Sequence, residues 1–270
     1  MPAGTPARLG RSFPGFELLS AGLGSLVLLL VVAPLLGVFL TGSLSGLSAA
    51  AVDAEVTRSI RLSLGAALTA TLFCALAGIP LSYLLARRRF WGRPVLLALI
   101  DLPVVVPHSA AGIALLTVIG RHSWLAHLTG GLVGTYAGIA IAMAFVSLPY
   151  LLNAAREGFT SVPVRLEEVA RTLGASPARV FFTISLPLAW RSVLSGMILM
   201  WARGISEFGA VVIVAYYPMT TPVLIFQRFN DYGLTYARSA AQLLLLVCIL
   251  IFVALRFVAR TRKEPEGNHA

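Results

Sequence analysis

Two opposite charges lie inside an apolar stretch in the last third of the chain. Arg203 and Glu207 are four residues apart in a segment otherwise free of charge, so on a helix they would share one face. A lone charge there would be costly, and an arginine would suit a passing anion. Two interpretations stay open: an ion pair that braces neighbouring helices, or a pair that lines or gates a wet path. Ser206 and Gly209 beside them belong to the same candidate path.

Other chemistry finds little support in the sequence. The histidines His108, His122, His127 and His269 do not have the spacing of a metal site. Cys74 and Cys248 fall in apolar runs, where a cysteine acts as a small hydrophobe. The only lysine, Lys263, precedes Glu264, which excludes the phosphate-binding motif G-x-x-x-x-G-K-[ST]. We therefore predict no catalytic residue, metal or cofactor in this chain, and expect a separate subunit to bind any ATP and magnesium.

The composition indicates that these residues are carried by membrane-spanning helices. Of the 270 residues, 58% are hydrophobic and only 12% are charged, whereas soluble domains carry about 25% charged residues. Several apolar runs reach the roughly 17–25 residues that cross a bilayer. The first run, Leu18–Leu40, exceeds the roughly 7–15 apolar residues of a cleaved signal peptide. We predict an uncleaved first span, although Ala49-Ala50-Ala51 faintly resembles a cleavage site.

Six spans are expected, and basic residues set their orientation. The spans are roughly Leu18–Leu40, Ile60–Ala86, Val95–Ile119, Leu132–Leu152, Ser192–Ala215 and Ser239–Ala259. Short cytoplasmic loops are enriched in arginine and lysine. With the N-terminus in the cytoplasm, most of the 21 basic residues lie on that side. The opposite side holds Arg58, Arg61, Arg121, Arg228 and Arg238. Both termini are thus expected in the cytoplasm, and the net charge of +10 needs no nucleic-acid partner.

This orientation places segment 153–189 in the cytoplasm, with the pattern of two short helices. Ser161-Val162-Pro163 and Ser176-Pro177 are typical helix starts, and Gly174 is a typical helix end. Glu167 and Arg171 are spaced to form an ion pair. One apolar stripe consists of Leu166, Val169, Ala170 and Leu173. The pattern predicts either a docking surface for a partner in water or a hairpin that packs only on its own bundle. In this prediction Pro187 breaks the second helix or opens the next span.

The same loop resembles the motif of ABC importer inner-membrane permeases. The matching positions are Glu168, Ala170, Gly174, Ile184, Leu186 and Pro187. Val169 stands where that family often has a second alanine. The resemblance extends over about residues 57–260 and implies a type I ABC importer permease fold. It also implies that the first short loop helix docks into an ATP-binding subunit.

Two further segments resemble permeases for the oxyanions sulfate, molybdate and tungstate. They are Arg203-Gly204-x-x-Glu207-Phe208-Gly209-Ala210 and the outer run Tyr216-Tyr217-Pro218-Met219. The latter, together with residues 101–115, looks most like the molybdate/tungstate permeases. Thr221-Pro222 is expected to begin a short helix that stops near Gly233. Tyr217, Pro218, Thr221 and Pro222 are candidates for contact with an outer binding protein or for an outer gate; a plain loop is the alternative.

Proline also marks the third span. Pro103 and Pro107 are four residues apart and are expected to kink or unwind the helix. His108 beside them is either a structural histidine or a substrate contact.

Together these features predict an all-α polytopic membrane protein with six transmembrane helices. Residues 1–56 would hold the first span, 57–260 the permease domain and 261–270 a cytoplasmic tail. The expected function is that of an ABC permease subunit importing tungstate or molybdate across a prokaryotic cytoplasmic membrane. The expected partners are two ATPase subunits, an outer oxyanion-binding protein, a second copy of the chain and the bilayer. A sulfate/thiosulfate permease or an ATPase-independent secondary transporter is the alternative.

Overall fold

Helices make up most of the described part of the chain. The computed structural model describes residues 14–121, 123–129 and 131–260. The α-helices are α1 Pro14–Leu40, α2 Leu44–Val52, α3 Ala54–Arg87, α4 Arg93–Val105, α5 His108–Ile119, α6 Trp124–Thr129, α7 Tyr136–Ser161, α8 Val164–Thr172, α9 Pro177–Val180, α10 Leu186–Ile205, α11 Gly209–Val214, α12 Thr221–Tyr232 and α13 Leu234–Arg260. A π-helical segment, η1, spans Phe181–Ser185. No strand occurs among these residues, as the sequence predicted. The predicted tail, 261–270, lies outside the described residues.

The spans agree in number with the prediction when one bent pair counts as a single span. Five helical segments are long and apolar enough to cross a membrane: those containing α1, α3, α7, α10 and α13. The pair α4 and α5 meets the same criterion together, but its two halves are bent by 116°. The bend lies at Val106-Pro107, where proline lacks the N–H that would continue the helix. The predicted kink in the third span is confirmed.

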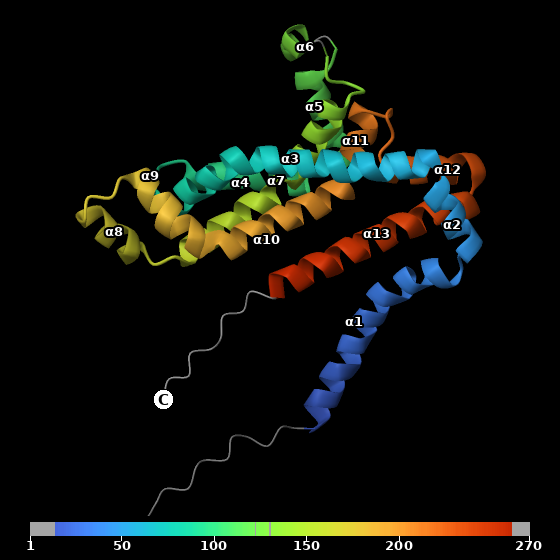
Figure 1. Cartoon of the computed structure of the whole chain (residues 1–270), viewed down its shortest axis with the longest axis horizontal. Coiled ribbons are helices and arrows are strands. Elements are labelled where there is room, and N and C mark those ends of the chain that lie inside the picture. Colours follow the sequence, from blue (N-terminus) through green and yellow to red (C-terminus); the bar gives the residue numbers. More distant parts are fainter. Residues whose placement is uncertain (1–13, 122, 130, 261–270) are drawn as a thin grey trace, which may run out of the picture.

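The centre of the bundle consists of α3, α7 and α10. α7 packs along both of the others, and the three run side by side in Figure 1. Small residues allow this approach: a Cβ on Gly196 of α10 would lie 2.9 Å from the Cβ of Ala154 of α7. A Cβ on Gly204 would lie 3.1 Å from that of Ala67 of α3. Close packing of small residues is the usual way for helices to associate within a membrane.

The fifth span differs from its predicted boundaries, Ser192–Ala215. α10 begins earlier, at Leu186, and ends at Ile205, and α11 is a separate short helix. The carboxylate of Glu207 accepts a hydrogen bond of 2.9 Å from the backbone N–H of Ala210, in the first turn of α11. This bond gives α11 its own start, so residues 206–208 form a helix break. Hydropathy could not reveal it, because both sides of the break are apolar.

The cytoplasmic loop differs from the prediction at the start of its first helix and agrees with it at the start of the second. Ser161 is the last residue of α7, where its hydroxyl donates to the carbonyl of Gly158, and α8 begins at Val164 without a side-chain cap. The predicted Ser161 cap was wrong because α7 extends further than its apolar run. Ser176 does cap the second helix, accepting from the N–H of Arg179 at 3.3 Å. That helix continues through η1 into α10, and Pro187 lies in the first turn of α10, so it opens the span.

Different short helices lie at the two ends of the bundle. In Figure 1, α8 and α9 lie at one end, and α2 and α12 lie at the other. From the end with α2 and α12, α13 runs back along the bundle toward the end with α8, whereas α1 diverges from it. The placement of both termini in the cytoplasm stays a prediction.

Candidate functional site

α8 ends at a sharp turn centred on Gly174. Gly174 has a φ of +85°, in the left-handed region that favours glycine. Its N–H donates to the carbonyl of Arg171 at 2.9 Å, and the N–H of Ala175 donates to that of Ala170 at 3.0 Å. These two bonds form a Schellman motif, which ends α8 and turns the chain sharply toward α9. The predicted glycine elbow is confirmed.

The outer face of α8 is apolar and uncovered in the single chain. Leu166 is 46% exposed, Val169 51% and Leu173 83%. The motif residue Glu168 is also exposed, on a different face of the helix from this stripe. α8 is packed against the end of the bundle mainly through its contacts with α9 and η1. Among the other motif positions, Ile184 and Leu186 are half-buried at the junction of η1 with α10, and Pro187 is exposed there.

Glu167 behaves differently from its neighbour Glu168. Its side chain is 3% exposed and pairs with Arg87 of α3, with 2.8 Å between Oε1 and Nη2. The predicted pair with Arg171 does not form, because Glu167 lies on the buried side of α8. No local pattern identifies this contact, since Arg87 lies 80 residues earlier in the chain.

The second candidate site surrounds the helix break at 206–208. Nη2 of Arg203 lies 2.9 Å from Oε2 of Glu207 and 2.8 Å from Nε2 of His108. Glu207 is 1% exposed and Arg203 is 20% exposed. The predicted ion pair is therefore present, and it joins the break in the fifth span to the break in the third. The sequence left the role of His108 open and did not predict this contact.

Gly209 completes this junction by its lack of a side chain. A Cβ at this position would lie 2.7 Å from the Cβ of His108 and 3.2 Å from its carbonyl carbon. The starts of α5 and α11 can approach this closely only because residue 209 is glycine. The two bent spans thus meet around Arg203, Glu207, Gly209 and His108.

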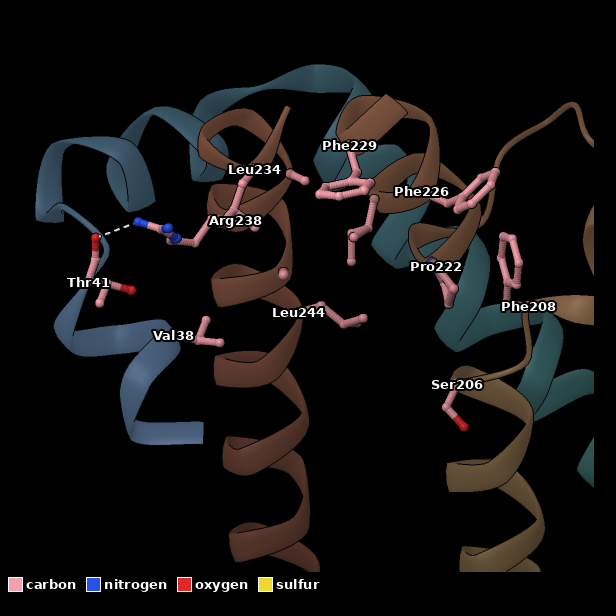
Figure 2. Close-up of a pocket in the computed structure, with 13 residues that line it drawn as sticks. Val38, Thr41, Ser206, Phe208, Pro222, Phe226, Phe229, Leu234, Arg238 and Leu244 are labelled. Atoms are coloured by element: carbon pink, nitrogen blue, oxygen red, sulfur yellow. Dashed lines mark hydrogen bonds between the residues drawn. The ribbon is translucent and has the colours of Figure 1, made fainter. Parts of the chain in front are cut away.

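An apolar groove opens beside the break, with a volume of about 660 Å³. Figure 2 shows Ser206 and Phe208 on one wall, Leu244 of α13 on the other, and Pro222, Phe226 and Phe229 of α12 above, while Arg238 of α13 points toward Thr41. Arg238 donates to the carbonyl of Thr41 at 2.7 Å. Ser206 is exposed, so two of the predicted residues, Ser206 and Pro222, border one common space.

The outer candidates separate into exposed and buried residues. Tyr217 is 58% exposed, and its ring lies 5.1 Å from that of Tyr216, between centroids. Thr221 is fully buried, and its N–H donates to the hydroxyl of Ser63 on α3 at 2.8 Å. The predicted helix start at Thr221 is confirmed, as is its end at Gly233, which has a φ of +82°. Thr221 therefore anchors α12, while Tyr217 lies at the surface.

Comparison with known proteins agrees with this architecture. Residues 78–263 match the family described as "Binding-protein-dependent transport system inner membrane component". The chain is also 45% identical over 240 residues to the molybdate/tungstate transport system permease protein WtpB of Pyrococcus furiosus, covering 88% of this chain and 93% of that one. The chain belongs to this family of inner-membrane transport components.

A further relative and a solved structure show how far the likeness extends. A probable sulfate transport system permease protein of Chlorokybus atmophyticus is 34% identical over 205 residues, covering 73% of this chain and 72% of that one. A solved bacterial ABC transporter that imports the acidic polysaccharide alginate aligns with a TM-score of 0.69 at 14% identity, covering 92% and 96% of the two chains. That structure supports the type I importer permease fold. Within the described residues, no group of histidine, cysteine and acidic side chains is arranged to hold a metal ion.

Proposed function

We propose that this permease is the membrane subunit of an ATP-driven importer of an oxyanion, tungstate or molybdate. The likeness to the molybdate/tungstate permease of Pyrococcus furiosus is the observation that carries the substrate class. The sulfate permease relative is less similar, which makes sulfate or thiosulfate the second candidate. Two copies of the chain form the pathway and work with an outer oxyanion-binding protein.

In this proposal α8 is the docking helix for a separate ATPase subunit. Its exposed stripe of Leu166, Val169 and Leu173 is an apolar surface facing away from the bundle. A short amphipathic helix with such a stripe fits a groove on a partner. Two ATPase subunits bind and hydrolyse ATP with magnesium, each docked on one α8. The motif residues Glu168, Ala170, Gly174, Ile184, Leu186 and Pro187 form or support this contact.

ATP binding would draw the two docked helices together and turn the pathway from inward-facing to outward-facing. To invert an equilibrium from 1:99 to 99:1 requires about 5.5 kcal/mol of differential binding. α8 is fixed to the spans at both of its ends, by α7 before it and by the Gly174 turn after it. A displacement of α8 is therefore transmitted to α7 and α10.

The helix break at 206–208 is proposed as the gate region of the pathway. Arg203, Ser206, Glu207 and Gly209 lie where two bent spans meet, and Ser206 faces the open groove. The charge of Arg203 is engaged by Glu207, which leaves it poorly suited to hold a dianion tightly. High affinity then belongs to the outer binding protein, which would contact Tyr217, Pro218 and Pro222. The predicted contact at Thr221 is wrong, because its side chain is fully buried.

Uptake by reconstituted vesicles tests this function. Vesicles containing the permease with its ATPase and binding protein are loaded with ATP, and uptake of labelled tungstate is measured with molybdate or sulfate as competitor. We expect uptake that needs ATP and the ATPase subunit and that molybdate suppresses at lower concentration than sulfate. If sulfate competes more strongly than molybdate, sulfate becomes the assigned substrate. Uptake without the ATPase subunit would instead indicate a secondary transporter.

A further inference from the structure

A buried cluster of polar side chains lies beneath α8, on the side opposite its exposed stripe. Glu167 lies at its centre and accepts hydrogen bonds from three donors. Nε of Arg87 lies 2.8 Å from Oε1, the hydroxyl of Ser185 lies 2.8 Å from Oε1, and the hydroxyl of Tyr83 lies 3.0 Å from Oε2. We call Glu167, Arg87, Tyr83 and Ser185 the Glu167 cluster.

The cluster connects three elements and reaches a fourth. Tyr83 and Arg87 belong to α3, Glu167 to α8 and Ser185 to η1. Arg87 also donates from Nη2 to the carbonyl of Val162, the residue that follows α7, at 3.0 Å. One carboxylate and one guanidinium therefore join α8 to the ends of α3 and α7 and to the segment that leads into α10.

Aromatic side chains close the cluster off from water. The ring of Tyr83 packs edge-on against those of Phe159 and Phe181, with centroid distances of 5.4 and 5.1 Å. The guanidinium of Arg87 lies 5.9 Å from the centroid of Tyr83. In such surroundings an ion pair is held in one geometry, and removing one partner leaves an uncompensated charge.

The π-helical segment accounts for the position of Ser185. η1 ends at Ser185, whose side chain is fully buried against Glu167. π-helical turns are rare and occur frequently at functional sites. Here the widened turn lies between the docking helix and the fifth span, at the point where a displacement must pass from one to the other.

We propose that Glu167 is a positioning residue that makes α8 move as one body with α3, α7 and α10. The apolar stripe faces the partner, whereas Glu167 faces the bundle and converts a displacement of α8 into a displacement of the spans. This inference rests on the proposed docking of an ATPase subunit on α8. The Glu167 cluster is the connection through which the docked helix moves the spans.

The test compares Glu167→Gln with the parent complex of permease, ATPase and binding protein in vesicles. The first readout is the amount of tungstate imported per ATP hydrolysed. Because allosteric coupling commonly spans factors of about 5–150, we expect this ratio to fall about fivefold or more while ATPase binding is retained. Glu157→Gln is the matched control, since Glu157 is an exposed glutamate near the end of α7 that leads into α8. It should leave the ratio unchanged.

The second readout is hydrogen exchange of the same complexes, which does not depend on the substrate. Glu167→Gln should speed exchange of the amides of α8 and leave those of α3 and α7 unchanged. If both readouts equal those of the parent, the proposal is overturned. A lower ratio without faster exchange overturns it too, because Glu167 would then act by direct contact with the ATPase.

Two milder variants keep the proposal testable if Glu167→Gln does not assemble. Ser185→Ala and Tyr83→Phe each remove one hydroxyl donor and retain the ion pair. Each should lower the ratio and speed exchange in α8, by less than Glu167→Gln. Parent-like values for both variants would overturn the proposal. Leu173→Asp tests the docking claim separately. We expect this variant to lose ATPase binding, and retained binding would contradict docking on α8.

Discussion

Two buried carboxylates, Glu167 and Glu207, hold the chain together at different places and in different ways. Glu207 pairs with Arg203, one helical turn away, and caps the next helix through the N–H of Ala210. Glu167 has no partner on its own helix and binds side chains from α3 and η1. The first carboxylate holds a break open within one span, whereas the second joins a loop helix to several spans.

The largest effect is expected where the local pair is broken. Arg203→Ala leaves Glu207, which is 1% exposed, without its cation. Removing one partner of a buried pair costs about 3–5 kcal/mol. We expect less assembled permease after extraction, measured by size-exclusion chromatography and thermal unfolding.

Arg203→Lys separates the two roles left open for this pair. Lysine keeps the charge but loses the planar contact with both Glu207 and His108. If Arg203 braces the junction, assembly should be partly restored. If Arg203→Ala assembles fully but imports no tungstate, Arg203 acts in the pathway and the bracing role is contradicted.

The junction between the two broken spans should also resist an added methyl group. Gly209→Ala places a Cβ 2.7 Å from that of His108, so α5 and α11 must separate. Overpacking of this kind costs about 1–3 kcal/mol. The thermal unfolding midpoint should fall, whereas Gly24→Ala on α1, whose Cβ meets nothing within 4 Å, should not lower it. An unchanged midpoint for Gly209→Ala would argue against the tight junction.

A smaller change in stability is expected at the turn that follows α8. Gly174→Val forces a β-branched residue to a φ of +85°, at a cost of about 1–2 kcal/mol. A Cβ there meets nothing within 4 Å, so strain in the backbone is the cause. Import should fall steeply while ATP hydrolysis continues. Gly174→Asn is the control, because asparagine tolerates this conformation; full import by Gly174→Val would contradict the role of the turn.

The smallest effect is expected at the outer end of α3. Asp53 accepts from Arg228 of α12 at 2.8 Å, and both side chains are partly exposed. Exposed ion pairs contribute about 1 kcal/mol or less. Asp53→Asn should therefore lower the unfolding midpoint only slightly, and less than Arg203→Ala. A larger loss would show that the outer contact matters as much as the helix break.

The contacts of Glu167 and Asp53 should both weaken as the pH falls. Burial raises the pKa of Glu167, but hydrogen bonds from Arg87, Ser185 and Tyr83 and the charge of Arg87 outweigh it, so the pKa lies below its ordinary value. Burial likewise raises the pKa of Asp53. The hydrogen bonds from Arg228, Glu55 and Val56 outweigh burial, so this pKa also lies below its ordinary value. Their stabilisation is complete above their ordinary values, near 4.5 and 3.8, and is lost as pH falls below these. Stability and coupling should therefore not change through these groups between about pH 6 and 8.

The comparison of the two carboxylates also explains what the sequence could predict. The rule that pairs residues four apart predicted Arg203 with Glu207 correctly, but it wrongly predicted Glu167 with Arg171. It succeeded inside a span, where a charge has few other partners. It failed at the bundle end, where α3 supplies a buried cation from 80 residues away. Spans, proline breaks and the glycine turn are local features, and they were predicted well.

Features that depend on packing could not be predicted in this way. The contact of His108 with Arg203 joins two spans 95 residues apart, and no local pattern reports it. The π-helical segment before α10 and the separate start of α11 lie in apolar sequence that suits a continuous helix equally well. The roles of the motif residues in docking remain predictions that a partner complex must test.

Cysteine cross-linking from α8 tests the docking claim most directly. Leu173, which is 83% exposed, is replaced by cysteine in a chain with Cys74→Ala and Cys248→Ala, and the complete transporter is treated with a short bifunctional reagent. We predict a cross-link to the ATPase subunit whose yield changes between the nucleotide-free and ATP-bound states. A cross-link only to the second permease copy, or none to the ATPase in either state, would contradict the account.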